Sequence, residues 1–525
     1  MSKILIPIVI LSLFLRLYDL NWDQGFHLHP DERFLTMVGS AMQFNNYFDT
    51  KTSLLNPHNV GFGFFVYGTW PVILTKTISI ILSLDNYEHL ILVGRVLSAL
   101  FDTGTVIIIF YIAKNIFKNK LSAILSTLFY TLAILPIQLS HFFAVDTFLV
   151  FFLTLSLLLL IKIKHPVLVG LAFGLAVSAK ISAILFFPII LIKLFLNKKN
   201  ILYFFVSLLV SIRVFYPYLF DGLYLNQKVI QNWQTLKTFD VPGYFPPGVQ
   251  WINSTPYLYQ LSNTIFFGLG LPLGLIFLIS IFSSFKIIKK YPITGLLYLW
   301  IFGLFLYQGA QFAKPLRYLY PLYPAICILS GYYVSRLKPR FILITLLFIA
   351  IWIIGFLSIY SRPHTRVQAS FWINQNIPAG SKISCEYWDD CLPLFSSEKY
   401  QTIQIFPYDR SKLPDISNLD YLIFSSNRLY GGIPSAPQLY PNTSKFYADL
   451  FAGNSGFTKV AEFTSRPNLP IPGIKLCLTP PYFNYGFVSK INQYCNQNGI
   501  SLVDDYAEES FTVYDHPKII IFKKI

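Results

Sequence analysis

Residues 90–112, LILVGRVLSALFDTGTVIIIFYI, form an apolar stretch long enough to cross a lipid bilayer as one helix. A spanning helix needs about 20 apolar residues to match the hydrocarbon core. The stretch contains two charged residues, Arg95 and Asp102. A charge inside a spanning segment is costly unless it is paired or used, so the sequence predicts a membrane helix with a structural or functional ionic site.

Similar apolar stretches occur throughout the first 360 residues. Of the 525 residues, 54% are hydrophobic and 13% are charged, whereas soluble domains carry about 25% charged residues. This composition argues against a soluble globular protein, a disordered chain and a coiled coil. We predict a polytopic α-helical membrane protein with about eleven transmembrane helices, over residues 4–20, 90–112, 121–140, 147–161, 167–180, 182–196, 200–216, 263–285, 292–308, 318–335 and 341–359.

The segment 67–84 is also long enough to span, but it carries Pro71 and Lys76 and precedes an acidic loop at 85–88. If it crossed the membrane, every later basic cluster would lie outside the cell. We therefore predict that it is re-entrant or lies at the membrane interface.

The positive charge is unevenly distributed. Residues 361–525 contain 15 basic and 14 acidic residues, so most of the net charge of +16 lies in the apolar part. Together with Lys3, the short connections at 114–120, 162–164, 193–199, 286–290 and 336–340 hold 15 basic and no acidic residues. Basic loops remain in the cytoplasm. This predicts a plasma-membrane protein with a cytoplasmic N-terminus, and the charge pattern indicates lipid rather than nucleic acid as its surroundings.

Two regions follow from this topology. Residues 1–360 form the transmembrane region, with external loops at 21–89 and 217–262. Residues 361–525 form an extracytoplasmic domain of mixed α/β type, with an amphipathic helix at 366–377 and strands within 420–426 and 511–524. Spacing suggests the disulfides Cys385–Cys391 and Cys477–Cys495, although four cysteines allow three pairings and free thiols are an alternative.

The first external loop opens with HLHPDERF, which places His29, Asp31 and Glu32 a few residues after the first helix. Adjacent carboxylates at this position are either solvated or used in chemistry. The simple explanation is a helix that starts at Pro30, because acidic residues stabilise the positive end of a helix. With His27 and His29, Asp31 could also bind a divalent metal, but no further pattern supports a metal site.

A second acidic position follows the predicted third helix, in SHFFAVDTF, which contains His141 and Asp146. Asp146 emerges on the same side as Asp31 and lies in an otherwise apolar stretch. An ionisable residue at that depth is a functional candidate. The alternative is an N-cap for a helix starting at Thr147.

Four basic residues face the same side of the membrane. Arg95 could pair with Asp102, seven residues later on one helix face, or could hold a phosphate. Lys180 lies at an external hairpin, where snorkelling to the interface is an alternative. Lys314 and Arg317 form a compact pair between two helices. Such a pair suits a phosphate or a lipid headgroup, because both side chains form charge-assisted hydrogen bonds with phosphate oxygens.

In their order and sidedness, these elements resemble the GT-C superfamily of integral-membrane glycosyltransferases. The resemblance is to the bacterial and archaeal branch related to protein O-mannosyltransferases and lipid A aminoarabinose transferases. It covers most of residues 1–360 and rests on HPDE (29–32), Tyr67-Gly68 with Pro71, GRVLSALFDTGTV (94–106), SHF-x-x-x-D (140–146) and LRYLYPLYP (316–324).

The resemblance implies transfer of a sugar, with inversion, from a polyprenyl-phosphate donor to a protein, lipid or glycan acceptor on the extracytoplasmic face. By that analogy Asp31 is the general base, Glu32 orients it or shares its proton, and Asp146 assists. The leaving phosphate needs cations. The candidates that bind substrate or phosphate are Arg95, Arg317, Lys314, Lys180, His29 and His141. No cofactor is required by this chemistry.

The C-terminal domain departs from the O-mannosyltransferase pattern, so the acceptor stays open. Its stretch EYWDDCLP places Trp388 beside Asp389 and Asp390, which could contact a sugar or form a solvated turn. Two other functions remain open. A transporter or flippase of a lipid-linked substrate would need charges along a path through the bilayer, whereas these candidates gather on one face. A silent scaffold would lack the carboxylates that are present here.

Overall fold

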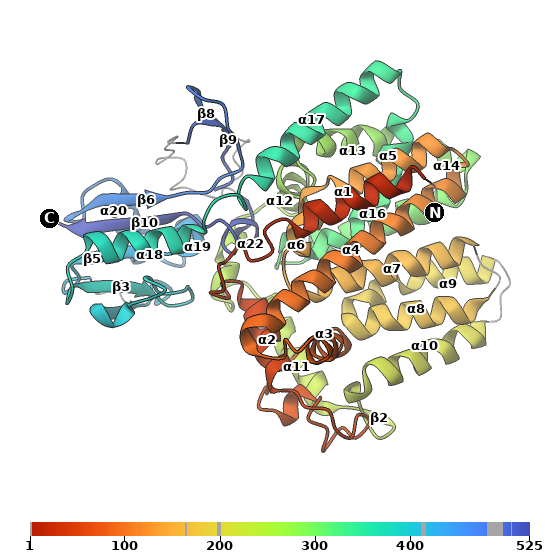
Figure 1. Ribbon diagram of the computed structural model, residues 1–525, viewed down its shortest axis with the longest axis horizontal. Helices are drawn as coiled ribbons and strands as arrows, with labels where there is room; N and C mark the ends of the chain where they lie inside the picture. Colours follow the sequence, from red (N-terminus) through yellow and green to blue (C-terminus); the bar gives the residue numbers. More distant parts are fainter. Residues whose placement is uncertain (1–2, 163–164, 197–200, 411–415, 480–496, 506) are drawn as a thin grey trace.

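The computed structural model of the chain describes residues 3–162, 165–196, 201–410, 416–479, 497–505 and 507–525. Long helices pack side by side in one half of the molecule, and the C-terminal residues form a sheet-containing half at the other end (Figure 1). The segment that joins them follows α17 (Pro339–Leu357).

The apolar stretches fold as helices because a backbone without access to water must satisfy its own hydrogen bonds. The described helices of this half, apart from those at its loop end, are α1 (Leu5–Leu17), α4 (Tyr87–Phe117), α5 (Lys120–Thr131), α6 (Ile134–Ser140), α7 (Val145–Lys162), α8 (Pro166–Ala179), α9 (Phe187–Leu196), α10 (Ile201–Phe215), α13 (Leu271–Ser283), α14 (Ile287–Lys290), α15 (Thr294–Ala310), α16 (Tyr323–Val334) and α17. One continuous apolar core joins them.

Within the described part of the chain, α4, α7 and α17 are long and apolar enough to cross a membrane. The helices α5 and α6 reach that length only if the bent pair is taken as one span. The predicted count of eleven spans is therefore not confirmed. Two of the predicted spans are not single straight helices. The stretch 121–140 bends by 54° between α5 and α6. The stretch 263–285 is broken at Gly270, whose φ is +80°.

Short helices cover one end of the bundle, where the loops 21–89 and 217–262 lie. These are α2 (Pro30–Ala41), α3 (Trp70–Ile81), α11 (Gln227–Thr238) and α12 (Leu258–Asn263), with the 3₁₀ turns η1 (Pro57–Asn59) and η4 (Pro246–Trp251). With 12 residues, α3 is about 18 Å long at 1.5 Å per residue, well short of the hydrocarbon core. Its Lys76 pairs with Asp85 (2.7 Å) beyond the helix end. The length of α3 agrees with the prediction that the segment 67–84 does not span the membrane.

Residues after Ser361 contain both helices and strands. A five-stranded sheet has the order β4 (Gln401–Ile405), β3 (Lys382–Glu386), β5 (Tyr421–Phe424), β10 (Ile519–Lys524), β6 (Phe457–Phe463). A smaller sheet contains β7 (Asn468–Leu469), β9 (Gly499–Leu502) and β8 (Lys475–Leu478). The helices are α18 (Thr365–Asn376), α19 (Arg428–Gly432), α20 (Pro441–Phe451) and α22 (Glu509–Thr512).

The expected helix at 366–377 and strand within 420–426 are present as α18 and β5. The expected strand within 511–524 is correct only from Ile519, because residues 509–512 form α22. Apolar alternation alone did not show that this segment turns back to contact the membrane helices. The Cys385–Cys391 disulfide is present, whereas the pairing of Cys477 with Cys495 involves a residue outside the described ranges.

Candidate functional site

The start of α2 positions the two adjacent carboxylates. The helix begins at Pro30, and the ring Nδ1 of His29 accepts hydrogen bonds from the backbone N–H groups of Asp31 (3.2 Å) and Glu32 (3.4 Å). Burial lowers the pKa of His29 to about 4, so this ring is neutral at pH 7. The expected helix start at Pro30, with acidic residues in the first turn, is confirmed, and its cap is His29.

Glu32 is enclosed in an ion-pair network. Two nitrogens of Arg95 each donate to the Glu32 carboxylate at 2.9 Å. Arg95 also donates to Asp23 at 2.8 and 3.1 Å and to the carbonyl of Leu20 at 2.7 Å. All three side chains are buried. The backbone N–H of Phe143 also donates to Glu32. Glu32 therefore ties α2, α4 and the loop before α7 together. Asp23, an acidic residue soon after α1, is a partner that the sequence did not indicate.

The expected pair between Arg95 and Asp102 is wrong. Seven residues along a helix correspond to about 10 Å of rise, which is too far for a direct contact. Asp102 instead pairs with Arg16 of α1 (2.5 Å) and accepts bonds from the hydroxyls of Tyr130 and Tyr320. Arg95 is fully buried and donates to two carboxylates, which leaves its expected phosphate role without a geometric basis.

Asp31 is the more accessible carboxylate, with a side chain 29% exposed, and it pairs with Arg317. Arg317 lies in η6 (Leu316–Leu322), just before α16. Burial would raise the pKa of Asp31, but Arg317 and His29 outweigh it and lower the pKa to about 2. Asp31 is therefore ionised at neutral pH, and Arg317 holds it in place.

A second ion pair lies beside the first. Lys180, at the end of α8, donates to Asp146 at 2.8 Å, and its Nζ is 5.3 Å from the ring of Tyr318. Asp146 is the second residue of α7, so the expected cap directly before Thr147 is wrong. Arg317 and Lys180 both stabilise the charge of Asp31 electrostatically. Two carboxylates and two cations are thus brought together from four separate elements.

Gly68 explains how the loop before α3 reaches this place. Its N–H donates to the carbonyl of Ala179 at 3.0 Å, and an added Cβ would lie 1.5 Å from the carbonyl oxygen of Ser178. Only glycine allows this approach. It places Tyr67 in the same group: burial first, then the charges of Asp31 and Asp146, raise the pKa of Tyr67 well above its usual value.

Two expected residues lie elsewhere. The buried side chain of Lys314 donates to the carbonyl of Phe312 (3.1 Å) and interacts electrostatically with Asp240. His141 is enclosed by bonds to the carbonyls of Ile137 (2.7 Å) and Tyr18 (2.9 Å). In the described structure, neither side chain contacts the Asp31–Arg317 pair. The expected substrate roles of Lys314 and His141 therefore lack a geometric basis.

The C-terminal half contributes a wall to the site. A small cavity is lined by His29 and Arg317 together with Ser510, Phe511 and Tyr514. The ring of Tyr514 lies 4.0 Å from that of His29. Sequence reasoning missed these residues, which lie 480 positions or more after His29 in the chain.

Glu508 anchors this wall. Its carboxylate accepts hydrogen bonds from the backbone N–H of Leu316 (3.1 Å) and from the side chain of Gln250 (3.3 Å). Its own N–H donates to Asn263 (2.7 Å). Because Leu316 precedes Arg317, Glu508 fixes the turn that presents the guanidinium to Asp31.

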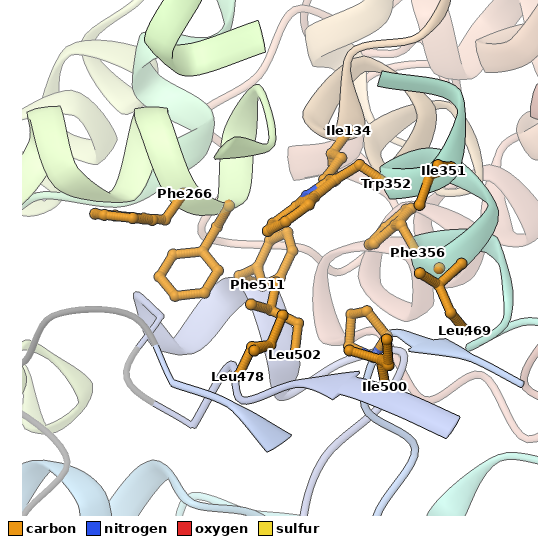
Figure 2. Close-up of a pocket in the computed structure, with 13 residues that line it drawn as sticks. Ile134, Phe266, Ile351, Trp352, Phe356, Leu469, Leu478, Ile500, Leu502 and Phe511 are labelled. Atoms are coloured by element: carbon orange, nitrogen blue, oxygen red, sulfur yellow. The ribbon is translucent and has the colours of Figure 1, made fainter. Parts of the chain in front are cut away.

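A second cavity lies where α17 and the turn before α13 meet the β7–β9–β8 sheet (Figure 2). Its walls are almost entirely apolar, and they include Trp352, Phe356 and Phe511. Phe511 lines both cavities. The apolar cavity and the cavity lined by Arg317 therefore share a wall.

In the described ranges, no three His, Cys, Asp or Glu side chains gather in a geometry that would hold a metal ion. The expected alternative with His27, His29 and Asp31 is not assembled: His27 stacks on Tyr87 at 4.3 Å, and His29 caps α2.

Residues 71–220 match the model of one protein family, dolichyl-phosphate-mannose-protein mannosyltransferase. The chain matches no curated protein sequence. Among solved structures, the apo oligosaccharyltransferase of Archaeoglobus fulgidus aligns with 85% of this chain and 72% of its own, at 14% identity and a TM-score of 0.50.

Two further structures are similar at lower scores. ArnT from Cupriavidus metallidurans, bound to undecaprenyl phosphate, covers 69% of this chain at 16% identity and a TM-score of 0.47, and this chain spans 65% of its length. AglB from Archaeoglobus fulgidus, in complex with an inhibitory peptide and a dolichol-phosphate, covers 85% of this chain and 72% of its own, at 13% identity and a TM-score of 0.47. The family match and the shared fold confirm the resemblance to the GT-C superfamily.

Proposed function

We propose that this chain, which resembles the GT-C superfamily of membrane glycosyltransferases, transfers a sugar from a polyprenyl-phosphate donor to an acceptor hydroxyl on the extracytoplasmic face. The observation that carries the proposal is the ion pair between Asp31 and Arg317, with Lys180 and Asp146 beside it. A base and the cations that a phosphate needs are combined in one partly exposed place. The matched family is named for transfer of mannose from dolichyl phosphate, which supports the class of donor.

In the proposed reaction, the acceptor hydroxyl loses its proton to the carboxylate of Asp31 and its oxygen attacks the anomeric carbon. The bond from that carbon to the phosphate oxygen breaks, and the polyprenyl phosphate leaves with the electron pair. Direct displacement inverts the anomeric centre. Arg317 and Lys180 stabilise the negative charge that develops on the leaving phosphate.

The ion pair gives the reaction an order. While Arg317 binds Asp31, the low pKa of the carboxyl makes it a weak base. A donor phosphate competes for the same guanidinium, because charge-assisted bonds to phosphate suit its planar fork. Once Arg317 turns to the phosphate, Asp31 regains basicity beside the anomeric carbon. Glu32 acts as a positioning residue in this scheme, because Arg95 and Asp23 enclose it.

The proposal is tested with the full chain in lipid nanodiscs and radiolabelled sugars on undecaprenyl phosphate or dolichyl phosphate. Asp31→Asn keeps the size of the side chain and removes the base. We expect transfer or release of the sugar to fall at least a hundredfold, as for loss of a general base, while donor binding persists. Asp49→Asn, an exposed position in the same loop, is the matched control.

Equal turnover by wild type and Asp31→Asn would remove Asp31 from the chemistry. A wild type that turns over no donor but moves a labelled lipid across a vesicle would instead favour a transporter, the competing function.

A further inference from the structure

The loop after β3 presents Trp388 to the outside. Its side chain is 42% exposed, and its backbone adopts φ +82°, which is unusual for a residue other than glycine. The Cys385–Cys391 disulfide closes the loop around it, and Arg428 donates to its carbonyl at 2.7 Å. A strained, cross-linked loop that exposes a large ring is typical of a binding site.

The neighbouring carboxylates are not part of a solvated turn. Arg366 donates to Asp389 (2.6 Å) and to Asp390 (2.7 Å), and Arg33 of α2 donates to the other oxygen of Asp390 (3.1 Å). Asp390 and Arg33 are partly exposed. The prediction that Asp389 and Asp390 form a solvated turn is therefore wrong. The bond between Arg33 and Asp390 also connects the Trp388 loop to α2, because Arg33 follows Asp31 by two residues.

Trp388 belongs to a series of aromatic rings that crosses three separate segments. Consecutive centroids lie 4.6 to 6.4 Å apart along Phe64, Phe239, Phe245, Trp388, Tyr387 and Phe406. Tyr387 is 48% and Phe406 50% exposed. The rings come from the first external loop, the second external loop and the sheet-containing half. The exposed rings of this series form an apolar patch on the surface, and such patches mark interaction sites.

Resting on the proposed function, we propose that this ring series and the Arg33–Asp390 pair form a saccharide-binding surface for the acceptor. The face of a pyranose ring is a flat array of C–H groups that packs on an aromatic ring, and its hydroxyls suit a guanidinium and a carboxylate. Arg33 is two residues from Asp31 on the first turn of α2. Side chains two residues apart on a helix point to different faces, so the proposed surface adjoins the end of α2 that carries the proposed base, on another side of the helix.

A membrane belt would look different. Belt residues lie at the ends of spanning helices, whereas these rings follow the strands β3 and β4 or lie in the loops around 64 and 239–245. The charged pair at the edge of the series also suits a polar ligand. These features favour a saccharide over a lipid surface.

The test measures saccharide binding separately from transfer. Fluorescently labelled full chain in nanodiscs is applied to an array of neutral and acidic oligosaccharides, and the dissociation constant of the best ligand is measured by titration. Trp388→Ala is expected to weaken binding about tenfold, a size typical of one lost aromatic contact. Phe371→Ala removes an exposed ring from α18, outside the series, and is expected to bind like wild type.

Trp388→Phe keeps an aromatic ring at the same position and is expected to bind more tightly than Trp388→Ala, which separates loss of the ring from a folding effect. The same titration with Asp31→Asn separates the two proposals: binding without transfer supports this surface and leaves only the chemistry in question. If Trp388→Ala binds the oligosaccharide as tightly as wild type and still transfers sugar, the proposed binding surface is wrong. A wild type that binds no oligosaccharide but binds peptides or protein-free vesicles through Trp388 would also overturn the proposal.

Discussion

His516 joins the two halves of the molecule, and its charge makes a testable link between pH and stability. Its ring Nε2 lies 3.0 Å from Asp504, and its Nδ1 bonds Asp515. Asp515 also accepts bonds from Gln138 of α6 and from the hydroxyl of Tyr360, both at 2.9 Å. All of these groups are buried. Replacement of His516 by Gln removes the cation that contacts both of these buried carboxylates.

The size of the effect follows from the pKa. Burial would lower the pKa of His516, but Asp515 and Asp504 outweigh it and raise the pKa from 6.5 to about 10. Each pKa unit corresponds to about 1.4 kcal/mol, so the charge stabilises the folded state by at most about 5 kcal/mol. Because the folded pKa is raised, this stability is complete below about pH 6.5 and is lost as the pH rises through about 10.

The assay is thermal unfolding of the full chain in nanodiscs, followed by tryptophan fluorescence from about pH 6 to about pH 10.5. At pH 7, His516→Gln is expected to cost about 3–5 kcal/mol, the usual cost of breaking a buried ion pair, and to lower the melting temperature by on the order of 10 °C. His89→Gln, an exposed position, is the control. Equal melting temperatures of wild type and His516→Gln at pH 7 would refute the argument, as would parallel pH profiles.

Two further changes test the site. Arg317→Gln removes the cation that lowers the pKa of Asp31, so burial then dominates and the pKa rises; we expect the acid limb of the pH–rate profile to move up by about 2 units. Arg317→Lys keeps the charge, and an acid limb equal in Arg317→Gln and wild type would contradict the assignment. Gly68→Ala places a Cβ 1.5 Å from the Ser178 carbonyl oxygen and is expected to cost at least about 3 kcal/mol and most of the activity, whereas Gly63→Ala, with no atom within 4 Å, should behave as wild type in melting and turnover.

The local features of the site could be predicted because they depend on neighbouring residues. Pro30 after His29, with two acidic residues following, specifies a helix start by itself, and the helix begins there. Asp31 and Arg317 were both recognisable from the sequence as candidate site residues. Their partnership was not, because 286 residues separate them and no local pattern fixes which carboxylate meets which cation.

The ion-pair partners show the same limit most clearly. Arg95 and Asp102 share one helix face, and pairing within the helix was the natural interpretation. The bundle instead brings Glu32 and Asp23 to Arg95, and Arg16 to Asp102. A buried charge takes whichever opposite charge the packing places within contact distance.

By itself the sequence determined a bundle of apolar helices, the charged residues that became site candidates, and the start of α2. Apolar runs, basic connections and helix caps act over a few residues, so their consequences are written locally. Only the tertiary structure decided that residues 508–514 form a wall of the site, that Glu508 holds the turn before Arg317, and that three distant segments contribute to one series of rings. These contacts depend on how helices and sheet pack against each other, and packing is set by the shape of the whole core.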